Sequence, residues 1–189
     1  MTKENTEFNK NLKNKKQELR NFAKKVREDN SFRQFDEKIV NNIKFTNYYT
    51  SSQNVMLFYP LANEINVLKL LDDKKNFSFP AIKNDKIVPL KYNGKFCKGE
   101  FNVQEPYQAE EQNLLELDLI IVPALCADKK GYRLGYGKGY YDRFIKTLDR
   151  KKTKILVPVY SKLLVDDIYA EDFDEKADLI VTENEIIEF

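Results

Sequence analysis

The sequence has no histidine among its 189 residues. Without imidazole, Ser-His-Asp and Cys-His nucleophile systems, histidine zinc sites and imidazole general bases are all excluded. The two cysteines, Cys97 and Cys126, stand far apart, so we expect neither a disulfide framework nor a cysteine metal cluster. Any chemistry must therefore use lysine, arginine, carboxylates, tyrosine, backbone amides or a bound hard cation.

Long apolar runs and a strong charge of one sign are also missing. No run of about 18 apolar residues occurs, so we expect no membrane-spanning helix. The first residues lack the apolar core of a secretory signal, and Glu4 and Glu7 argue against an organelle transit peptide, which favours a cytoplasmic protein. A formal net charge of +2 is too mild to favour nucleic acid binding.

The charge is nevertheless uneven along the chain. Residues 1–30 hold nine Lys or Arg against five Asp or Glu, a balance of +4. Residues 166–189 hold ten Asp or Glu against one Lys, a balance of −9. The pattern fits two solvated faces, or a basic arm and an acidic end that meet at one polyanion and its metal.

Helical and strand patterns alternate through the chain. Apolar residues at helical spacing predict helices, and short dense apolar runs predict buried strands. The predicted helices cover residues 10–29, 32–45, 64–73 and 140–150, and the predicted strands cover 54–60, 76–82, 86–92, 118–125, 154–160 and 178–183. This order predicts an α/β fold, a single domain over residues 10–189 with a largely parallel (mixed) central sheet flanked by helices. We expect residues 1–9 to be disordered or frayed.

One stretch, GYRLGYGKGYYD over residues 131–142, concentrates the glycines. Four of the six in the chain fall within nine positions, at Gly131, Gly135, Gly137 and Gly139. The stretch follows the strand at 118–125 and opens the helix at 140–150, at the sheet edge where open α/β sheets bind ligands. Glycine lets a ligand approach the backbone, free N–H groups at a helix start hold an anion, and Lys138 adds a positive charge. It is neither a Walker A loop nor a dinucleotide fingerprint. The spacing alone therefore fits either a phosphate site or a tight structural crossover.

The run from Gly131 to Phe144 resembles the signature G-x-R-L-G-x-G-x-G-Y-Y-D-R-F of the 5-formyltetrahydrofolate cyclo-ligase family, also called 5,10-methenyltetrahydrofolate synthetases. The resemblance continues in order along nearly the whole chain. Its other matching segments are Lys16 to Arg20, Tyr59-Pro60 with Glu64, Glu105-Pro106, Asp118 to Pro123, and Asp174, Asp178, Thr182 and Glu183. The chain departs from the family where Ala127 replaces a frequent Phe and Phe173 replaces a frequent His.

The resemblance implies the open sheet of the cyclo-ligase (CoA-transferase-like) type and an ATP- and Mg²⁺-dependent enzyme of folate metabolism. Such an enzyme converts 5-formyltetrahydrofolate to 5,10-methenyltetrahydrofolate and releases ADP and phosphate. The γ-phosphoryl group activates the formyl oxygen as an imino-phosphate, and N10 then closes the ring. Phosphoryl transfer needs positioning and charge neutralisation more than covalent work by side chains, which suits a chain without histidine.

The resemblance also assigns roles to residues. It implies ATP binding by Lys16, Gln17, Glu18, Leu19 and Arg20, and by Arg133, Leu134, Gly135, Tyr136, Gly137, Lys138, Gly139, Tyr140 and Tyr141. Among these, Lys138, Arg133 and Tyr140 would be catalytic. Tyr59 and Glu64 would bind the folate substrate, and Asp142 and Asp174 would hold Mg²⁺.

Each role has a structural alternative. Lys16 and Arg20 lie one turn apart and also fit a solvated helix face. Tyr140 and Tyr141 also fit an aromatic core at a helix start. Asp142 also fits a partner of the helix dipole, and Glu64 could equally cap the short helix that begins there.

Three rival functions remain open at this point. One is a related ATP-dependent ligase acting on a different formyl or amide substrate. Another is a non-catalytic nucleotide- or folate-binding protein. The last is an RNA-associated protein, which the mild net charge disfavours. We expect small-molecule partners, a reduced formyl folate and ATP, with no nucleic acid and no membrane, and a monomer or weak homodimer.

Overall fold

The computed structural model describes residues 3–189, without the side chains of residues 3–9 and of Phe101. Its centre is a seven-stranded sheet in the order β12-β11-β9-β6-β1-β2-β3. The five inner strands run parallel, while β12 and β3 pair antiparallel with β11 and β2 at the two edges. The prediction of a mixed, largely parallel sheet is therefore confirmed.

The bounds of the elements are as follows. The helices are α1 (Lys3–Glu28), α2 (Asp36–Phe45), α3 (Asn47–Ser51) and α4 (Tyr140–Ile145), with 3-10 helices η1 (Asn30–Phe35), η2 (Val67–Asp72), η3 (Glu100–Asn102), η4 (Leu114–Glu116) and η5 (Ser161–Leu163). The strands of the central sheet are β1 (Asn54–Met56), β2 (Asn76–Lys83), β3 (Lys86–Lys91), β6 (Leu119–Ile121), β9 (Lys154–Pro158), β11 (Leu179–Val181) and β12 (Ile186–Glu188). The shorter strands are β4 (Phe96–Lys98), β5 (Gln104–Pro106), β7 (Cys126–Asp128), β8 (Arg133–Leu134) and β10 (Leu164–Val165).

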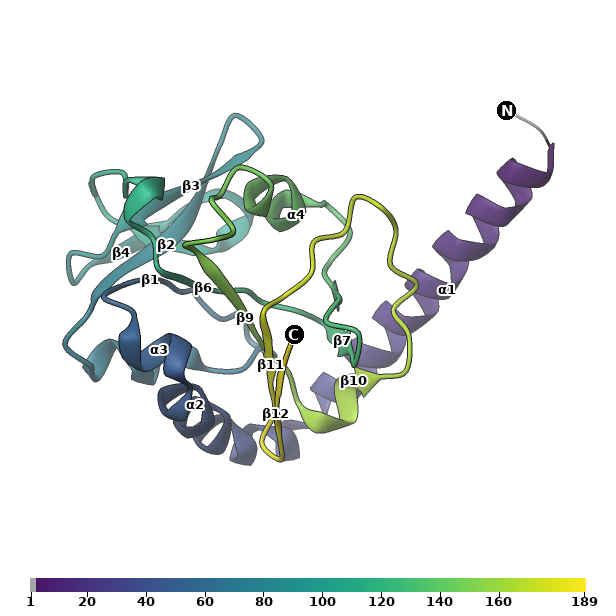
Figure 1. The fold of residues 1–189 in the computed structure, drawn as a ribbon, viewed down its shortest axis with the longest axis horizontal. Helices are drawn as coiled ribbons and strands as arrows, with labels where there is room; N and C mark the ends of the chain where they lie inside the picture. The colour runs from purple at the N-terminus through teal and green to yellow at the C-terminus, as the bar shows by residue number, and fades with distance from the viewer. Residues whose placement is uncertain (1–2) are drawn as a thin grey trace.

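The inner strands are aliphatic because both faces of the sheet are covered. Every residue of β6 has an exposed fraction of 0%. In Figure 1 the sheet lies between α2 and α3 below it and α4 above it. A parallel sheet with both faces covered favours continuous apolar strands over alternating ones. This explains why the short apolar run around Leu119 was readable as a strand.

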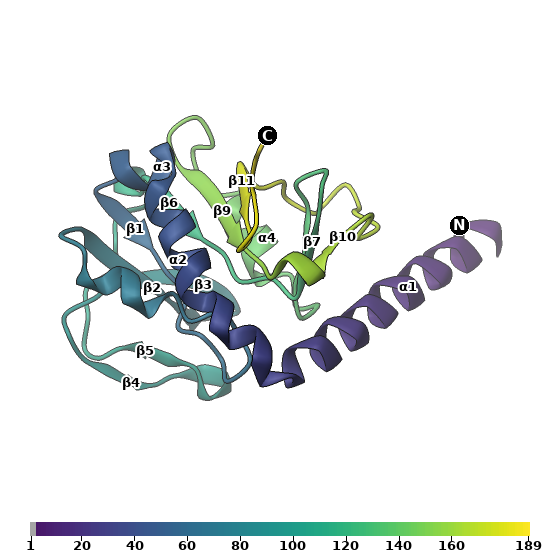
Figure 2. The same cartoon turned by 90° about the horizontal axis from the view of Figure 1, so that it is seen from below.

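Helix α1 contacts the body through its C-terminal half. Ala23 and Val26 on that half are buried. The N-terminal half of α1 extends away from the rest of the molecule, as Figures 1 and 2 both show. Within residues 3–189, no helix combines the length and the apolar content needed to cross a lipid bilayer.

Four predicted helices have different bounds in the structure. The helix predicted over 10–29 begins at Lys3, and the expected fraying of residues 1–9 stays a prediction because residues 1–2 lie outside the described chain. The helix predicted over 32–45 begins as a 3-10 turn, and that predicted over 64–73 is the 3-10 helix η2. The helix predicted over 140–150 ends at Ile145, because the Thr147 hydroxyl and N–H both bond to the Phe144 carbonyl and tighten the chain.

Two small sheets, β10-β7-β8 and β4-β5, were not predicted. The first has a functional consequence, because β7 follows β6 and forms a hairpin with β8, which lies within the glycine stretch. The expectation that the stretch directly follows the central strand is therefore wrong. Its first residues instead form β8, and Leu125 N–H bonds to the Leu134 carbonyl at 2.7 Å.

Candidate active site

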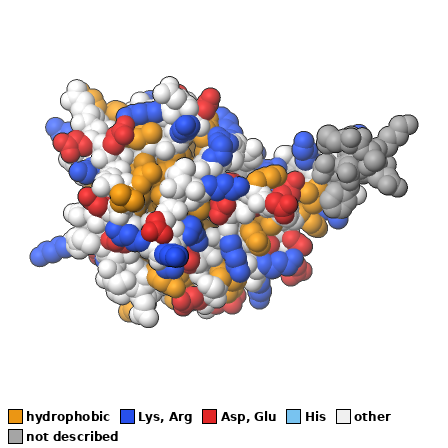
Figure 3. Space-filling view, turned by 45° about the horizontal axis from the view of Figure 1, so that its top comes forward, with side chains coloured by type: hydrophobic (Ala, Val, Ile, Leu, Met, Phe, Trp, Pro, Cys, Tyr) orange, Lys and Arg blue, Asp and Glu red, His pale blue; other side chains and the backbone are white. Residues whose placement is uncertain are grey.

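A cavity of about 730 Å³ lies where α1, the glycine stretch, the β2–β3 hairpin and the loop after β1 meet. One part of its wall is apolar, with Phe58, Ile82 and Ile87. Another part is charged, with side chains from α1, the glycine stretch and residues 171–174. On the face seen in Figure 3, apolar side chains gather near the middle of the body and Lys and Arg side chains lie beside them, toward α1.

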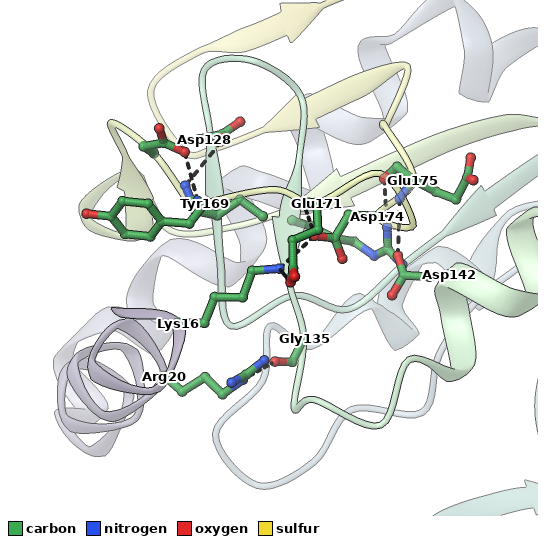
Figure 4. A network of polar contacts seen from close by, with 12 residues as sticks. Lys16, Arg20, Asp128, Gly135, Asp142, Tyr169, Glu171, Asp174 and Glu175 are labelled. Carbon is green, nitrogen blue, oxygen red and sulfur yellow. Dashed lines mark hydrogen bonds and ion pairs between the residues drawn. The ribbon is translucent and has the colours of Figure 1, made fainter. Parts of the chain in front are cut away.

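The glycine stretch is held against α1 by Arg20. Its Nε donates a hydrogen bond to the Gly135 carbonyl at 3.0 Å, as drawn in Figure 4. Gly137 has φ +96°, and a Cβ there would lie 3.3 Å from the Arg20 guanidinium carbon. The backbone angle therefore favours glycine at this position, and an added Cβ would also crowd the Arg20 guanidinium.

Lys16 lies one helical turn before Arg20 and is 6% exposed. Its ammonium group lies 2.8 Å from Glu171 Oε2 and 2.8 Å from Asp174 Oδ2 (Figure 4). Burial alone would lower the pKa of Lys16, but the hydrogen bonds to Asp174 and Glu171 outweigh it and raise the pKa. Lys16 is thus a fixed positive charge at the cavity wall, and the alternative of a solvated helix face is wrong for it.

Arg133 and Asp142 form a second ion pair, with 2.9 Å between Arg133 Nη2 and Asp142 Oδ1. Arg133 also donates to the Glu175 carbonyl at 3.0 Å, and Glu175 N–H donates to Asp142 Oδ1 at 3.3 Å. The pair therefore joins β8, α4 and the loop before β11, and it holds the two ends of the glycine stretch together.

The two predicted metal ligands both line the cavity. Asp142 uses Oδ1 and Asp174 uses Oδ2 for the bonds above, and within residues 3–189 the other oxygen of each has no hydrogen-bond partner. In that described part, no group of three or more acidic or cysteine side chains is placed to hold a metal. Mg²⁺ commonly takes one or two carboxylates together with waters and substrate phosphates. The donor set fits a cation that binds together with phosphates.

Glu64 is 5% exposed at the cavity wall. It accepts hydrogen bonds from Leu61 N–H at 2.9 Å and from the Tyr136 hydroxyl at 3.1 Å. Burial raises its pKa above the ordinary value, and these two hydrogen bonds and the charge of Arg27 oppose that shift. The N-cap of η2 is Asn66, so the alternative in which Glu64 caps that helix is wrong.

The start of α4 is tied to the turn between β2 and β3. The Tyr140 hydroxyl donates to Asp85 Oδ1 at 3.3 Å, and the Arg143 guanidinium lies 5.0 Å from the Tyr140 ring centre. Arg143 also donates to the Lys138 carbonyl at 2.9 Å. Tyr141 lines the cavity as well, and burial raises its pKa. These contacts bring the glycine stretch to the β2–β3 hairpin, whose Ile82 and Ile87 line the apolar wall.

Most of the predicted site residues line this one cavity. They are Tyr59, Glu64, Lys16, Gln17, Arg20, Asp174 and the run Arg133 to Asp142. Glu18 and Leu19 do not line it, because Glu18 is exposed on another face of α1 and Leu19 packs against the core.

Sequence reasoning gave no role to several charged side chains in or near the cavity, among them Glu171 and Arg27, and it noted Phe173 only as a departure from the family. Glu171 and Phe173 line the cavity, but they lie in an irregular loop that has no periodic signal. Arg27 is 5% exposed and donates to the Ala124 carbonyl, while its Nε and Nη1 have no partner in the described structure. Its position eleven residues after Lys16 places it on the same face of α1, and that spacing could have identified it.

The chain resembles known proteins along most of its length. The sequence model of the 5-formyltetrahydrofolate cyclo-ligase family matches residues 8–183. A 5-formyltetrahydrofolate cyclo-ligase of Mycoplasma pneumoniae is 30% identical over 155 residues, covering 78% of this chain and 84% of the relative. One of Mycolicibacterium smegmatis is 31% identical over 138 residues, covering 66% of this chain and 70% of the relative.

Solved structures show the same fold. The NMR structure of Aquifex aeolicus 5,10-methenyltetrahydrofolate synthetase has a TM-score of 0.80 and 28% identity, with 92% of each chain covered. The Mycoplasma pneumoniae synthetase, at 23% identity, has a TM-score of 0.70 and covers 88% of this chain and 97% of its own. With the matched sequence and the shared fold together, the chain is an enzyme that belongs to the 5-formyltetrahydrofolate cyclo-ligase family.

Proposed function

We propose that this enzyme converts 5-formyltetrahydrofolate to 5,10-methenyltetrahydrofolate with ATP and Mg²⁺, releasing ADP and phosphate. One observation carries the proposal. One cavity is lined by a cationic glycine-rich stretch, by apolar side chains and by a buried carboxylate, Glu64. A triphosphate fits the cationic stretch, and a flat heterocycle with N–H donors fits the apolar side chains and the carboxylate.

The reaction needs an activated formyl oxygen, because that oxygen is a poor leaving group. Transfer of the γ-phosphoryl group to it breaks the β–γ bond of ATP, releases ADP and forms an imino-phosphate. N10 of the folate then attacks the activated carbon, the ring closes and phosphate leaves. Both steps move negative charge between oxygens, so fixed positive charges and N–H donors are the useful groups.

The cationic residues would bind and orient the triphosphate. Lys16, Arg20 and Lys138 line the same wall as the backbone amides of the glycine stretch. We call the part of the glycine stretch from Arg133 to Asp142 the phosphate cradle. Arg133 is already paired with Asp142, so its role would be to hold this cradle in shape as well as to neutralise charge. Asp142 and Asp174 would hold the Mg²⁺ ion, which when bound neutralises phosphate charge.

The apolar wall would bind the folate. Ionised Glu64 would accept hydrogen bonds from ring N–H groups, and Tyr59 would pack against the ring, since Tyr59 is itself supported edge-on by Phe96 at 5.0 Å between centroids. Tyr140 lines the same cavity from the start of α4. We further propose that the enzyme acts in the cytoplasm as a monomer or weak homodimer. Light scattering of the purified protein tests the oligomeric state.

The test is growth of the methenyl-folate absorbance band. The purified enzyme is mixed with 5-formyltetrahydrofolate, ATP and Mg²⁺, and ATP or Mg²⁺ is withheld in controls. We expect the band only in the full mixture, and its loss in Lys138→Ala. The matched control is Lys129→Ala, an exposed lysine outside the cavity.

Two other outcomes would point elsewhere. ATP hydrolysis stimulated by folate without the band would indicate a ligase for a related formyl or amide substrate. Binding of ATP and folate with no turnover would indicate a non-catalytic binding protein. Loss of the band in Lys129→Ala as well would show that the effect of Lys138→Ala does not depend on the cavity.

A further inference from the structure

We propose that Glu171 is a displaceable counter-charge, which holds Lys16 in the nucleotide-free enzyme and is replaced by phosphate oxygens when nucleotide binds. Glu171 would therefore limit the affinity for nucleotide. The inference rests on the proposed function, because it takes Lys16 as a phosphate ligand.

The two carboxylates around Lys16 are not equivalent. Asp174 Oδ2 accepts from Lys16 at 2.8 Å and also from Glu171 N–H at 2.9 Å, and the Asp174 side chain is 12% exposed. Glu171 contacts Lys16 through Oε2 at 2.8 Å, and its side chain is 29% exposed. Within residues 3–189 the Glu171 carboxylate has no other hydrogen-bond donor. Asp174 is thus fixed by the backbone, whereas Glu171 can rotate into solvent without losing a second bond.

The position of the pair connects it to the cradle. Figure 4 shows Lys16 directed from α1 to the two carboxylates, and Arg20, one turn later, directed to Gly135. Lys16, Glu171 and the glycine stretch line the same cavity. A phosphate group bound by the stretch would therefore lie within the reach of the Lys16 ammonium, which has three donors to share.

The negative charge of Glu171 opposes phosphate binding in two ways. A phosphate entering this wall must compete with Glu171 for Lys16, and it is repelled by the Glu171 charge if that carboxylate stays in place. Charge-assisted hydrogen bonds are stronger than neutral ones, so this competition is measurable. Because Glu171 is part exposed, solvent screens the effect and keeps it moderate.

The experiment measures ADP binding by isothermal titration calorimetry, with EDTA present so that no metal contributes. We expect Glu171→Gln to bind ADP about threefold to tenfold more tightly than the wild type, where tenfold corresponds to about 1.4 kcal/mol. The variant keeps the side-chain length and one acceptor oxygen. If Glu171 had a purely structural role, its substitution would weaken ADP binding rather than tighten it.

The matched control is Asp172→Asn, which removes the same charge from the neighbouring exposed residue outside the cavity. We expect less than a twofold change there. When Lys16→Met is already present, adding Glu171→Gln should change the ADP affinity by less than twofold, as Asp172→Asn does, because no cation is left to release. In steady state, the KM for ATP should fall in Glu171→Gln.

The outcomes separate the two proposals. A wild-type enzyme that binds no ADP and forms no methenyl folate would overturn the proposed function. A wild-type enzyme that binds ADP, combined with unchanged or weaker binding in Glu171→Gln, would overturn the role of Glu171 alone. Equal tightening with and without Lys16 would also overturn it, because the effect would then come from general charge.

Discussion

Replacing Gly137 by Ala tests whether the glycine stretch is a conformationally fixed cradle. At φ +96° an L-residue is strained, and such strain typically costs about 1–2 kcal/mol. The added Cβ would also lie 3.3 Å from the Arg20 guanidinium and would weaken its hydrogen bond to the Gly135 carbonyl. That bond is part-buried, so its loss adds at most about 1 kcal/mol. We expect the free energy of unfolding to fall by about 2 kcal/mol.

Two other glycines separate the contributions. Gly94 has φ +89° and lies in the exposed turn after β3, where an added Cβ would meet no atom within 4 Å, so Gly94→Ala adds strain alone. Gly135 lacks a positive φ and also has no atom within 4 Å, so Gly135→Ala should change stability by less than about 0.5 kcal/mol. The order of destabilisation should be Gly137→Ala, then Gly94→Ala, then Gly135→Ala.

Thermal unfolding and ADP titration together make the assay. For a chain of this size, a loss of about 2 kcal/mol lowers Tm by about 4–8 °C. We expect Gly137→Ala to weaken ADP binding at least tenfold, because Arg20 and the backbone amides both shift, and Gly94→Ala to leave it unchanged. A fixed cradle is refuted if Gly137→Ala is as stable as Gly135→Ala, or if Gly94→Ala weakens ADP binding as much as Gly137→Ala.

Three further changes test the charges around the cavity. Asp142→Asn leaves buried Arg133 without its counter-charge. The free energy of unfolding, measured by urea titration, should therefore fall by about 1–3 kcal/mol, and the formation of methenyl folate should be lost. In Glu64→Gln the KM for folate should rise. Burial raises the pKa of Glu64 above 4.5, so the wild type should lose folding stability as pH rises through that raised pKa. The variant should not show this loss. In Arg27→Met the pKa of Glu64 should rise further, so half-maximal folate affinity should move to higher pH, whereas Lys24→Met on the exposed face should not move it.

Each of these three predictions has an outcome that would contradict it. Full activity in Asp142→Asn would show that this carboxylate is only a structural partner of Arg133. A stability difference between Glu64→Gln and the wild type that stays constant with pH would show that Glu64 is not shifted by burial. An unchanged folate pH profile in Arg27→Met would show that the Arg27 charge does not act on Glu64.

The inner strands β1, β6, β9 and β11 were predictable because they are dense apolar runs of the kind that a covered parallel sheet favours. The edge strand β12 was not predicted. The hairpin of β7 and β8 was not predicted either, since strands of two or three residues such as Arg133–Leu134 are too short to show a period. The early end of α4 depends on one hydroxyl, that of Thr147, and helical periodicity does not report such a contact. Sequence patterns therefore predicted the elements that hydrophobic burial determines and missed those that single hydrogen bonds determine.

The candidate site shows the same division. Lys16 and Arg20 were found through the family resemblance, since their spacing of one helical turn alone also fits a solvated face, and the glycines were found because their density is unusual. Glu171 was missed because it stands in the irregular chain between β10 and β11, where neither spacing nor composition marks one acid among several. Its importance comes only from the 2.8 Å contact with Lys16, across 155 residues of sequence.

The uneven charge of the chain now has a physical basis. The basic N-terminal helix and the acidic C-terminal region were expected either to be solvated separately or to meet at a polyanion. In the structure they meet each other, through Lys16 with Glu171 and Asp174. A triphosphate bound at that position would therefore meet a cation that is already paired with two acids rather than an uncompensated positive site. The same two charge blocks that stabilise the nucleotide-free fold would then set how tightly the nucleotide binds, and a change in one acid alters both.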